Sequence, residues 1–543
     1  MAFLSLAAPI GDPSAPKGGT FVVGLSGYPQ HLLHYIAQDE YAKAVNELVL
    51  EPLLELSAKT NQPLSRLAER WEARRDQKEI TFWIDPRAKF SDGEAVLASD
   101  VLFTWELLQR PESGMAAARS NFEMIASCEV LAPRTVRFAM KGPHFKNLGS
   151  FAEFFILPRH FYEGKEVRKV LSSQLLGSGP YRIKEVESGR RIELERNKHF
   201  WGGSLEQNLG RYNFDRVLFH VNPNTDSLHE LFKRGETDFH YYMSSRQWAT
   251  ETDSLPFQRH YIEKLKVQNS REFGAMAIAW NLRRPLFQDA RVRRALSHLM
   301  PRDRWIHDLF YDQYVPATGI VGVSSPNHSK ANVGIAYNPR QAVKLLNAAG
   351  WKIAESGKRK KEGRIFRFEV VSDTPALEKV LTLYQEELAK VGIEMQIRNV
   401  EWALGMKLLD DRQFDAYPVS RSREVEPGNF AAEWGSANAG IAGSQNLTGY
   451  RNQKVDQLAL AIDTAIDPMK RRRKIQELDE IIARDQPMSW CWEPTYFRIG
   501  YWNRVSFPGK GYFPYSYWTN VFHYWWWDAD KAAKLKNPLI ATF

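Results

Sequence analysis

Cysteine is scarce in this chain of 543 residues, which contains only Cys128 and Cys491. Two cysteines so far apart cannot define a disulfide framework, and a bridge between them or two buried free thiols both remain open. The sequence also has no run of about 18 apolar residues, the length that a membrane-spanning helix needs. These two absences argue against a small disulfide-stapled module and against an integral membrane protein.

The motifs that mark several enzyme classes are missing as well. The sequence has no G-x-S-x-G elbow, H-E-x-x-H pair, Walker loop or G-x-G-x-x-G fingerprint, and Gly24-Leu25-Ser26-Gly27 misses the elbow by one position. His31-x-x-His34 has no carboxylate at a spacing typical of metal ligands. We therefore expect no catalytic residue, no bound metal and no cofactor.

Positive charge is in excess, since the formal net charge is +9. Two basic runs contribute to it, at residues 358–361 and 471–474. The first is predicted to be a solvated hairpin tip, and the second the polar face of a helix whose apolar face carries Ile475 and Leu478. Because no basic stripe is interleaved with aromatic residues, we expect no nucleic-acid partner.

Aromatic residues are abundant, with 30 Phe, 21 Tyr and 17 Trp. Such side chains fill large cores and also line pockets for extended organic ligands. A chain of this length is too long for one ordinary core, so two or three domains are expected.

Alternating strand and helix patterns dominate the second half of the chain. Residues 365–371 and 393–400 are predicted strands that flank a helix over 376–391. Asn338-Pro339 and Asp467-Pro468 each combine an N-cap residue with a proline in the first turn, and predict two further helices. This β-α-β order indicates an α/β fold.

The stretch from residue 79 to 108 carries the most specific local pattern. Thr81–Ile84 is typical of a strand, and Ser91-Asp92-Gly93 of a turn. Ser99 and Asp100 are expected to cap a helix that directs Val101, Leu102, Trp105 and Leu108 toward a core.

Several short motifs in collinear order resemble one known family. They include Phe90-x-Asp92-Gly93, Gly177-Ser178-Gly179-Pro180-Tyr181, Val292-Arg293-x-Ala295-Leu296 and Ala342-x-x-Leu345-Leu346-x-x-Ala349-Gly350. Together they resemble the extracellular solute-binding proteins of family 5, the oligopeptide and dipeptide receptors of ABC importers. Pro427-Gly428-Asn429, Glu433-Trp434-Gly435-Ser436, the run from Gly443 to Gly449 and Trp526-Trp527-Asp528 are similar to the branch that imports microcin C-type and other oligopeptides.

The resemblance implies a two-lobed periplasmic-binding-protein fold of type II, with an extra subdomain inserted in the N-terminal lobe. It places the N-terminal lobe at residues 18–48, 177–272 and 496–543, the inserted subdomain at 49–176 and the C-terminal lobe at 273–495. It further implies a periplasmic monomer that encloses a peptide ligand between its lobes and delivers it to an inner-membrane ABC permease. The N-terminus lacks the basic start and long apolar centre of a signal peptide, so we expect the sequence to represent a mature form.

The resemblance also suggests where the ligand binds. Counting from Trp402 and Phe414-Asp415, the acid that pairs with a peptide amine falls on Glu424, with Glu426 as a substitute and a solvated loop as the alternative for both. Arg421 and Arg423 could meet a ligand carboxylate or balance these two acids. The remaining predicted contacts, each with core or surface packing as its alternative, are Tyr28, His31, Trp402, Trp434, Gln445, Asn446, Trp490, Trp492 and Tyr496.

Two other classes of function stay open from the sequence. Many tryptophans and paired acids also suit a secreted carbohydrate-active hydrolase or an oligosaccharide-binding receptor. A structural or nucleic-acid-binding protein has only the net charge in its favour. Within the receptor interpretation, free peptides, cell-wall peptides, peptide antibiotics and an oligosaccharide are all candidate ligands.

Overall fold

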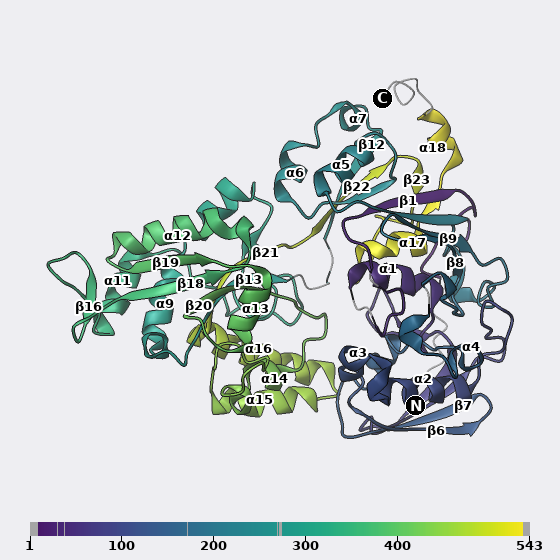
Figure 1. The fold of residues 1–543 in the computed structure, drawn as a ribbon, viewed down its shortest axis with the longest axis horizontal. Helices are drawn as coiled ribbons and strands as arrows, with labels where there is room; N and C mark the ends of the chain where they lie inside the picture. The colour runs from purple at the N-terminus through teal and green to yellow at the C-terminus, as the bar shows by residue number, and fades with distance from the viewer. Residues whose placement is uncertain are drawn as a thin grey trace. The chain divides into compact units, whose positions relative to one another are not determined.

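The computed structural model describes residues 9–29, 31–36, 39–170, 172–268, 270 and 274–535. Its chain divides into two compact units (Figure 1). Unit 1 comprises Met1–Met243, Thr250–Val267 and Phe497–Phe543, and unit 2 comprises Ser244–Ala249 and Gln268–Tyr496. The domain boundary expected between residues 272 and 273 lies outside the described residues, as do residues 1–8 and 536–543.

Unit 1 is built on a seven-stranded sheet in which β1 lies parallel to β10 and β11. Side chains of β1 alternate between buried and half-buried, as the Phe21-Val22-Val23 pattern predicts for a strand. In spatial order the strands are β12 (Ile262–Val267), β22 (Phe497–Trp502), β11 (Phe239–Tyr241), β1 (Thr20–Leu25), β10 (Arg216–Val221), β9 (Arg191–Arg196) and β8 (Tyr181–Glu187).

A separate four-stranded sheet in unit 1 contains the stretch with the family-like pattern. Its order is β4 (Ala68–Ala73), β5 (Glu79–Ile84), β7 (Thr135–Met140) and β6 (Ile125–Ala132). The predicted strand at 81–84 is confirmed, and alternate residues of β5 and β7 are buried. Phe82 packs against Phe138 and Phe151, with ring centroids 6.0 and 4.8 Å apart.

Helix α2 (Ala98–Gln109) packs on β6 and β7, but its start differs from the prediction. The N-cap is Leu97, and Asp100 is the third helical residue, whose carboxylate accepts from the Leu97 backbone N–H at 2.8 Å. Asp100 therefore supplies capping chemistry as expected, but from the third helical position, whereas Ser99 lies inside the helix and is not the N-cap. Val101 and Leu108 are buried as expected, whereas Leu102 and Trp105 are only half-buried.

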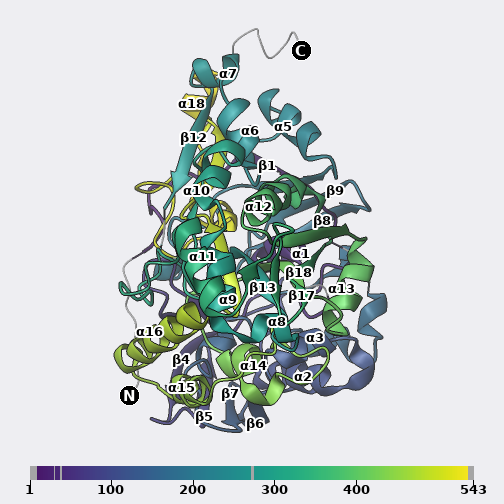
Figure 2. The same cartoon turned by 90° about the vertical axis from the view of Figure 1, so that its left-hand side faces the viewer.

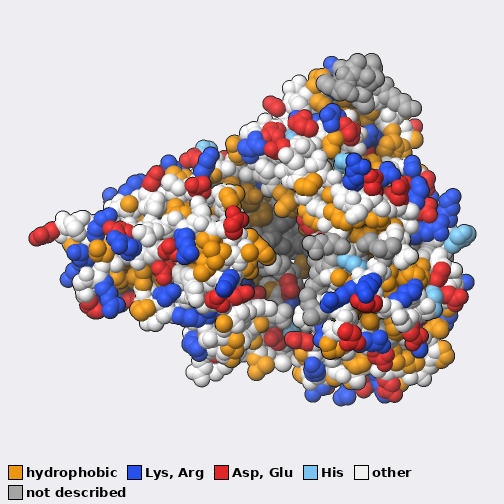
Figure 3. Space-filling view, in the orientation of Figure 1, with side chains coloured by type: hydrophobic (Ala, Val, Ile, Leu, Met, Phe, Trp, Pro, Cys, Tyr) orange, Lys and Arg blue, Asp and Glu red, His pale blue; other side chains and the backbone are white. Residues whose placement is uncertain are grey.

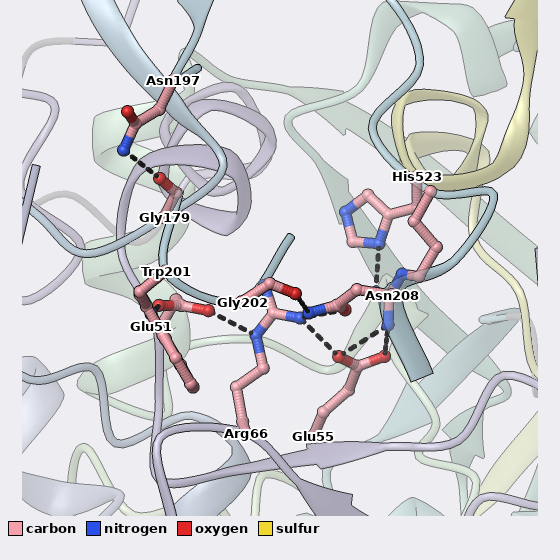
Figure 4. A network of polar contacts seen from close by, with 10 residues as sticks. Glu51, Glu55, Arg66, Gly179, Asn197, Trp201, Gly202, Asn208 and His523 are labelled. Carbon is pink, nitrogen blue, oxygen red and sulfur yellow. Dashed lines mark hydrogen bonds and ion pairs between the residues drawn. The ribbon is translucent and has the colours of Figure 1, made fainter. Parts of the chain in front are cut away.

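A buried network of charges lies beside β2 (Leu54–Leu56) in unit 1 (Figure 4). Arg66 contacts Glu51 at 2.9 Å and Glu55 at 3.4 Å, and Arg211 contacts Glu55 at 2.9 Å. Trp201 donates its indole N–H to Glu51, and Arg211 faces His523 Nδ1 at 3.3 Å. The network joins three distant parts of the sequence, because its members come from residues 51–66, 201–211 and 523.

Unit 2 is built on a six-stranded mixed sheet. In spatial order its strands are β14 (Val315–Pro316), β21 (Met488–Glu493), β13 (Ala275–Trp280), β20 (Ala416–Arg421), β18 (Arg367–Ser372) and β19 (Glu394–Asn399). β18 is parallel to β19 and β20, whereas β13 is antiparallel to β20 and β21. The predicted strands at 365–371 and 393–400 are confirmed to within two residues at each end.

Helices cover both faces of this sheet (Figures 1 and 2). On one face α9 (Ala290–His298), α11 (Pro339–Ala348) and α12 (Glu378–Lys390) form a large core that includes Trp280, Leu346 and Tyr384. On the other face α13 (Trp402–Asp410) packs Leu408 and Leu409 against Val371 and Tyr417. The remaining helices of interest are α14 (Phe430–Trp434), α15 (Gln453–Asp463) and α16 (Pro468–Asp485).

Both basic runs contain a buried arginine, so their assignment as wholly solvated was wrong. Arg359, on β16 (Arg359–Lys361), is buried and donates to the Val391 and Trp351 carbonyls. Arg471, on α16, is buried and donates to the Ala465 carbonyl and to Glu426. A guanidinium that finds fixed acceptors can be buried where the sequence shows only a charged run.

The cysteines and the surface complete the description. Cys128 and Cys491 are not bridged, and burial raises the pKa of each thiol to about 12. Acidic and basic side chains are interspersed over the visible face of each unit (Figure 3). Among the described residues, no helix combines the length and apolar character that crossing a bilayer requires.

Candidate functional site

The parallel strands of unit 2 end together at one edge of its sheet. β18, β19 and β20 are followed at this edge by Asp373, by the start of α13 and by Ser422. Antiparallel β13 begins here and β21 ends here, because Ala275 pairs with Arg421 and Met276 pairs with Trp492. In open α/β sheets, ligands bind outside the carboxyl ends of the parallel strands.

We call this region the polar edge of unit 2. It consists of Asp373, Trp402, Arg421, Arg423, Glu424, Glu426, Glu433, Arg471 and Glu493.

A buried ion pair lies within the polar edge. Arg423 contacts Glu493 at 2.5 Å, and the two side chains are only 4% and 2% exposed. Arg423 also donates to the Ile320 carbonyl, while Glu493 accepts from the Val323 backbone N–H at 2.6 Å. The pair therefore fixes the segment around residues 320–323, which gives Arg423 a structural task in addition to any ligand contact.

Two further ion pairs of the polar edge have more exposed acids than the buried pair. Arg421 contacts Glu433 at 2.5 Å and lies 6.0 Å from the Trp434 ring centroid. Glu426 contacts Arg471 at 2.7 Å. Glu424 is exposed on the intervening loop. The two acids proposed for a ligand amine thus lie in different surroundings, since Glu426 faces a buried guanidinium.

A β-bulge separates the two tryptophans of β21. Ala277 pairs with Trp490 and the adjacent Met276 pairs with Trp492, so Cys491 is the extra residue. Because paired residues share a face of the sheet, the bulge directs Trp490 and Trp492 to opposite faces. Trp492 packs in the large core against Trp305 and Phe310, with ring centroids 5.9 and 4.7 Å away. Trp490 lies instead 5.8 Å from the Arg423 guanidinium.

The remaining predicted contacts of unit 2 differ widely in exposure. Trp402 begins α13 and is 67% exposed, whereas Trp434 is 1% exposed. Asn446 is fully buried and bonds with backbone groups of Gly435, Gly449 and Tyr450. Gln445 beside it is exposed, and Tyr496 donates to Gln313 Oε1 at 2.8 Å.

The loop that carries Gln445 and Asn446 is held by two arginines. Arg283 donates to the carbonyls of Ala439, Asn446 and Leu447, and Arg412 donates to those of Ile441 and Ser444. Burial, followed by repulsion from Arg412, lowers the pKa of Arg283 to about 10. Gln445 is therefore exposed on a loop that hydrogen bonds from Arg283, Arg412 and the Asn446 side chain hold in place.

Tyr28 and His31 belong to unit 1, where they follow the carboxyl end of β1. Both are half-buried, and His31 Nδ1 accepts from the Leu33 backbone N–H at 2.9 Å. Burial lowers the pKa of His31, which favours its neutral imidazole. Because β1 is parallel to its neighbours, Tyr28 and His31 lie beyond the carboxyl end of a parallel strand, as the polar edge of unit 2 does.

Sequence reasoning missed several members of the polar edge. Asp373 lies two residues after the predicted strand at 365–371. Its position at the carboxyl end of a strand could have identified it as a candidate ligand contact. Glu493 and Arg471 carried no such signal, because their partners lie 70 and 45 residues away. Within the described residues, no group of three His, Cys, Asp or Glu is placed to hold a metal ion.

Comparison with known proteins yields one family. The sequence model described as "Bacterial extracellular solute-binding proteins, family 5 Middle" matches residues 62–441. The chain is 26% identical to the probable peptide-binding protein YejA of Agrobacterium fabrum, over 94% of this chain and 90% of that protein. It is also 26% identical to the peptidoglycan-binding protein YepA of the same organism, over 84% of this chain and 82% of that protein.

Solved structures share the fold. The oligopeptide-binding protein AppA of Bacillus subtilis, solved with a nonapeptide, aligns with a TM-score of 0.73 and 23% identity. The alignment covers 95% of this chain and 100% of AppA. The similarity supports the two-lobed type II fold that the sequence motifs imply.

Proposed function

Because this chain belongs to the bacterial extracellular solute-binding proteins of family 5, we propose that it is a peptide receptor of an ABC importer. It binds oligopeptides outside the cytoplasm, in the periplasm, and delivers them as a monomer to an inner-membrane permease. The observation that carries this proposal is the family match over residues 62–441. One relative described as a probable peptide-binding protein supports it, because the alignment covers 90% of that protein.

The polar edge of unit 2 supplies the chemistry that a peptide requires. Acids can pair with an ammonium group, Arg421 can meet a carboxylate in exchange for its ion pair with Glu433, and exposed Trp402 offers an apolar wall. The buried pair Arg423–Glu493 ties this edge to the segment at residues 320–323. Tyr28 and His31 are the proposed contacts from unit 1.

The ligand class is narrowed by the named relatives. AppA was solved with a nonapeptide, and YepA is described as peptidoglycan-binding. Free oligopeptides and cell-wall peptides are therefore the two classes we propose, in that order. Membership in the branch that imports microcin C-type peptides stays a prediction from the sequence motifs. A hydrolase has no support from the family, whose members are binding proteins.

Native mass spectrometry of protein purified without refolding tests the proposal. We expect co-purified ligands whose fragmentation yields amino-acid residue masses, and we expect their intact mass to be unchanged after long incubation. Muropeptides would give amino-sugar masses in addition to amino-acid masses. That result would identify cell-wall peptides as the ligand class. Glycans without amino acids, or steady turnover of an added peptide, would contradict a peptide receptor.

A further inference from the structure

The acids of the polar edge differ in whether a cation already neutralises them. Glu433, Glu493 and Glu426 each form an ion pair with an arginine. Asp373 differs, because within the described part of the chain no Lys, Arg or His forms an ion pair with it. Its carboxylate interacts with two hydroxyl groups, that of Thr374, which donates to Oδ1 at 3.0 Å, and that of the neighbouring Tyr417. Asp373 is half-buried, so its negative charge is partly desolvated without being compensated.

The position of Asp373 is fixed by three elements. It follows β18, which lies between β19 and β20 at the centre of the parallel strands. Tyr417 of β20 is its neighbour, and α13 approaches both residues closely at Gly405. A side chain at Gly405 would overlap the Tyr417 hydroxyl and would lie 2.9 Å from Asp373 Cβ. Glycine therefore allows α13 to approach the Asp373–Tyr417 pair closely.

An exposed indole lies on the same face of α13. Trp402 precedes Gly405 by three residues, which places the two on one side of the helix. Trp402 is 67% exposed, an unusual state for so large an apolar side chain. The close approach at Gly405 thus brings an uncompensated carboxylate and an exposed aromatic face to the same part of the polar edge.

We infer that Asp373 is the carboxylate that binds an ammonium group of the ligand, with Trp402 covering the adjoining part of that ligand. The inference rests on the proposed function and names the anchor within it. An ammonium group can donate charge-assisted hydrogen bonds to Asp373 and lie against the indole face. Burial, followed by the Asp373 carboxylate, raises the pKa of Tyr417, so its hydroxyl stays protonated beside this acid.

Asp373 is better placed for this role than the two loop acids. Glu426 already faces Arg471, so a ligand ammonium would compete with a buried guanidinium for it. Glu424 is exposed on its loop, where water weakens any ion pair. Asp373 combines partial burial with a position at the end of a central strand, and both strengthen a charge-assisted contact.

Three synthetic hexapeptide libraries without Arg or His test the inference. The first has free α-amines and no Lys, the second is N-acetylated with one Lys, and the third is N-acetylated without Lys. We expect the native protein to prefer the first or the second library over the third by about tenfold or more. Asp373→Asn should abolish this preference and leave affinity for the third library unchanged. The preferred library also identifies the ammonium as α-amine or side chain.

Matched variants separate the anchor from general charge effects. Asp410→Asn removes one exposed acid at the far end of α13, about 12 Å from Trp402 along the helix axis. This variant should keep the preference for the ammonium-bearing library. The double variant Glu424→Gln, Glu426→Gln should keep it too. Thermal unfolding verifies that each variant is folded, and Asp373→Ser replaces Asp373→Asn if the latter is not.

The outcomes distinguish the inference from the function on which it rests. A native protein that binds none of the three libraries contradicts the peptide-receptor function itself. A native protein that binds all three libraries equally overturns the Asp373 anchor and leaves the receptor function standing. The anchor is also overturned if the preference survives in Asp373→Asn or disappears in the Glu424→Gln, Glu426→Gln variant.

Discussion

The charge network of unit 1 and the polar edge of unit 2 differ in how far their side chains are exposed. In unit 1, Arg66 and Arg211 share Glu51 and Glu55 in a network enclosed by the fold (Figure 4). The polar edge of unit 2 is more open, because Arg423 and Glu493 are buried there while Glu424 and the indole of Trp402 are exposed. We infer that the network of unit 1 stabilises the fold, and we propose that the polar edge of unit 2 recognises the ligand.

Breaking the network of unit 1 should have the largest effect. Arg66→Met leaves Glu51 buried without its guanidinium partner, which should lower the free energy of unfolding by about 3–5 kcal/mol. The matched change Arg182→Met breaks a half-exposed pair with Glu195 in the same unit and should cost about 0–1 kcal/mol. Urea unfolding followed by circular dichroism measures both. Equal shifts for the two variants would show that the network is not a special source of stability.

Acid should weaken the same network through His523. Burial, followed by the neighbouring Arg211, lowers the pKa of His523 from 6.5 to about 3. Between these two pH values only the unfolded chain binds the proton, so this group contributes stability above pH 6.5 and loses it as pH falls. At pH 5 the loss is about 2 kcal/mol. His523→Gln should reduce the difference between thermal unfolding at pH 7.5 and pH 5, and an unchanged difference would contradict this account.

Truncating the exposed indole of unit 2 should leave stability unchanged and weaken binding. Trp402→Ala should reduce affinity for the preferred hexapeptide library about tenfold, which corresponds to about 1.4 kcal/mol. Leu460 on α15 is equally exposed, at 67%, and is the matched control. Calorimetric titration should show a loss for Trp402→Ala alone. A similar loss for Leu460→Ala, or a lowered melting temperature for Trp402→Ala, would remove the distinction between the two units.

The sequence predicts regular elements well where local signals are strong. The N-caps Asn338 and Asp467 are confirmed at the starts of α11 and α16, since each side chain accepts from backbone N–H groups of the first turn. The strands β5 and β7 follow their alternating patterns. These elements depend on neighbours within a few residues, which a single sequence displays directly.

The candidate site was less predictable, because its contacts join distant residues. The alternation of Trp490 and Trp492 suggests one shared face, but the bulge at Cys491 separates them and depends on pairing with β13. Arg471 was assigned to a solvated face because its run is basic, yet Glu426 and the Ala465 carbonyl hold it inside. Asn446 was a predicted ligand contact, and its side chain is fully engaged with backbone groups of its own loop. Its role toward a ligand stays a prediction.

Photo-crosslinking tests most directly whether the polar edge of unit 2 binds the ligand. A hexapeptide from the preferred library, carrying a diazirine side chain, is bound, irradiated and digested, and the modified residues are mapped by mass spectrometry. Our account predicts modification within 402–406 and 421–434, suppressed by excess unmodified peptide. Suppressible modification confined to the four-stranded sheet of unit 1, with none on α13 or the loop after β20, would contradict it.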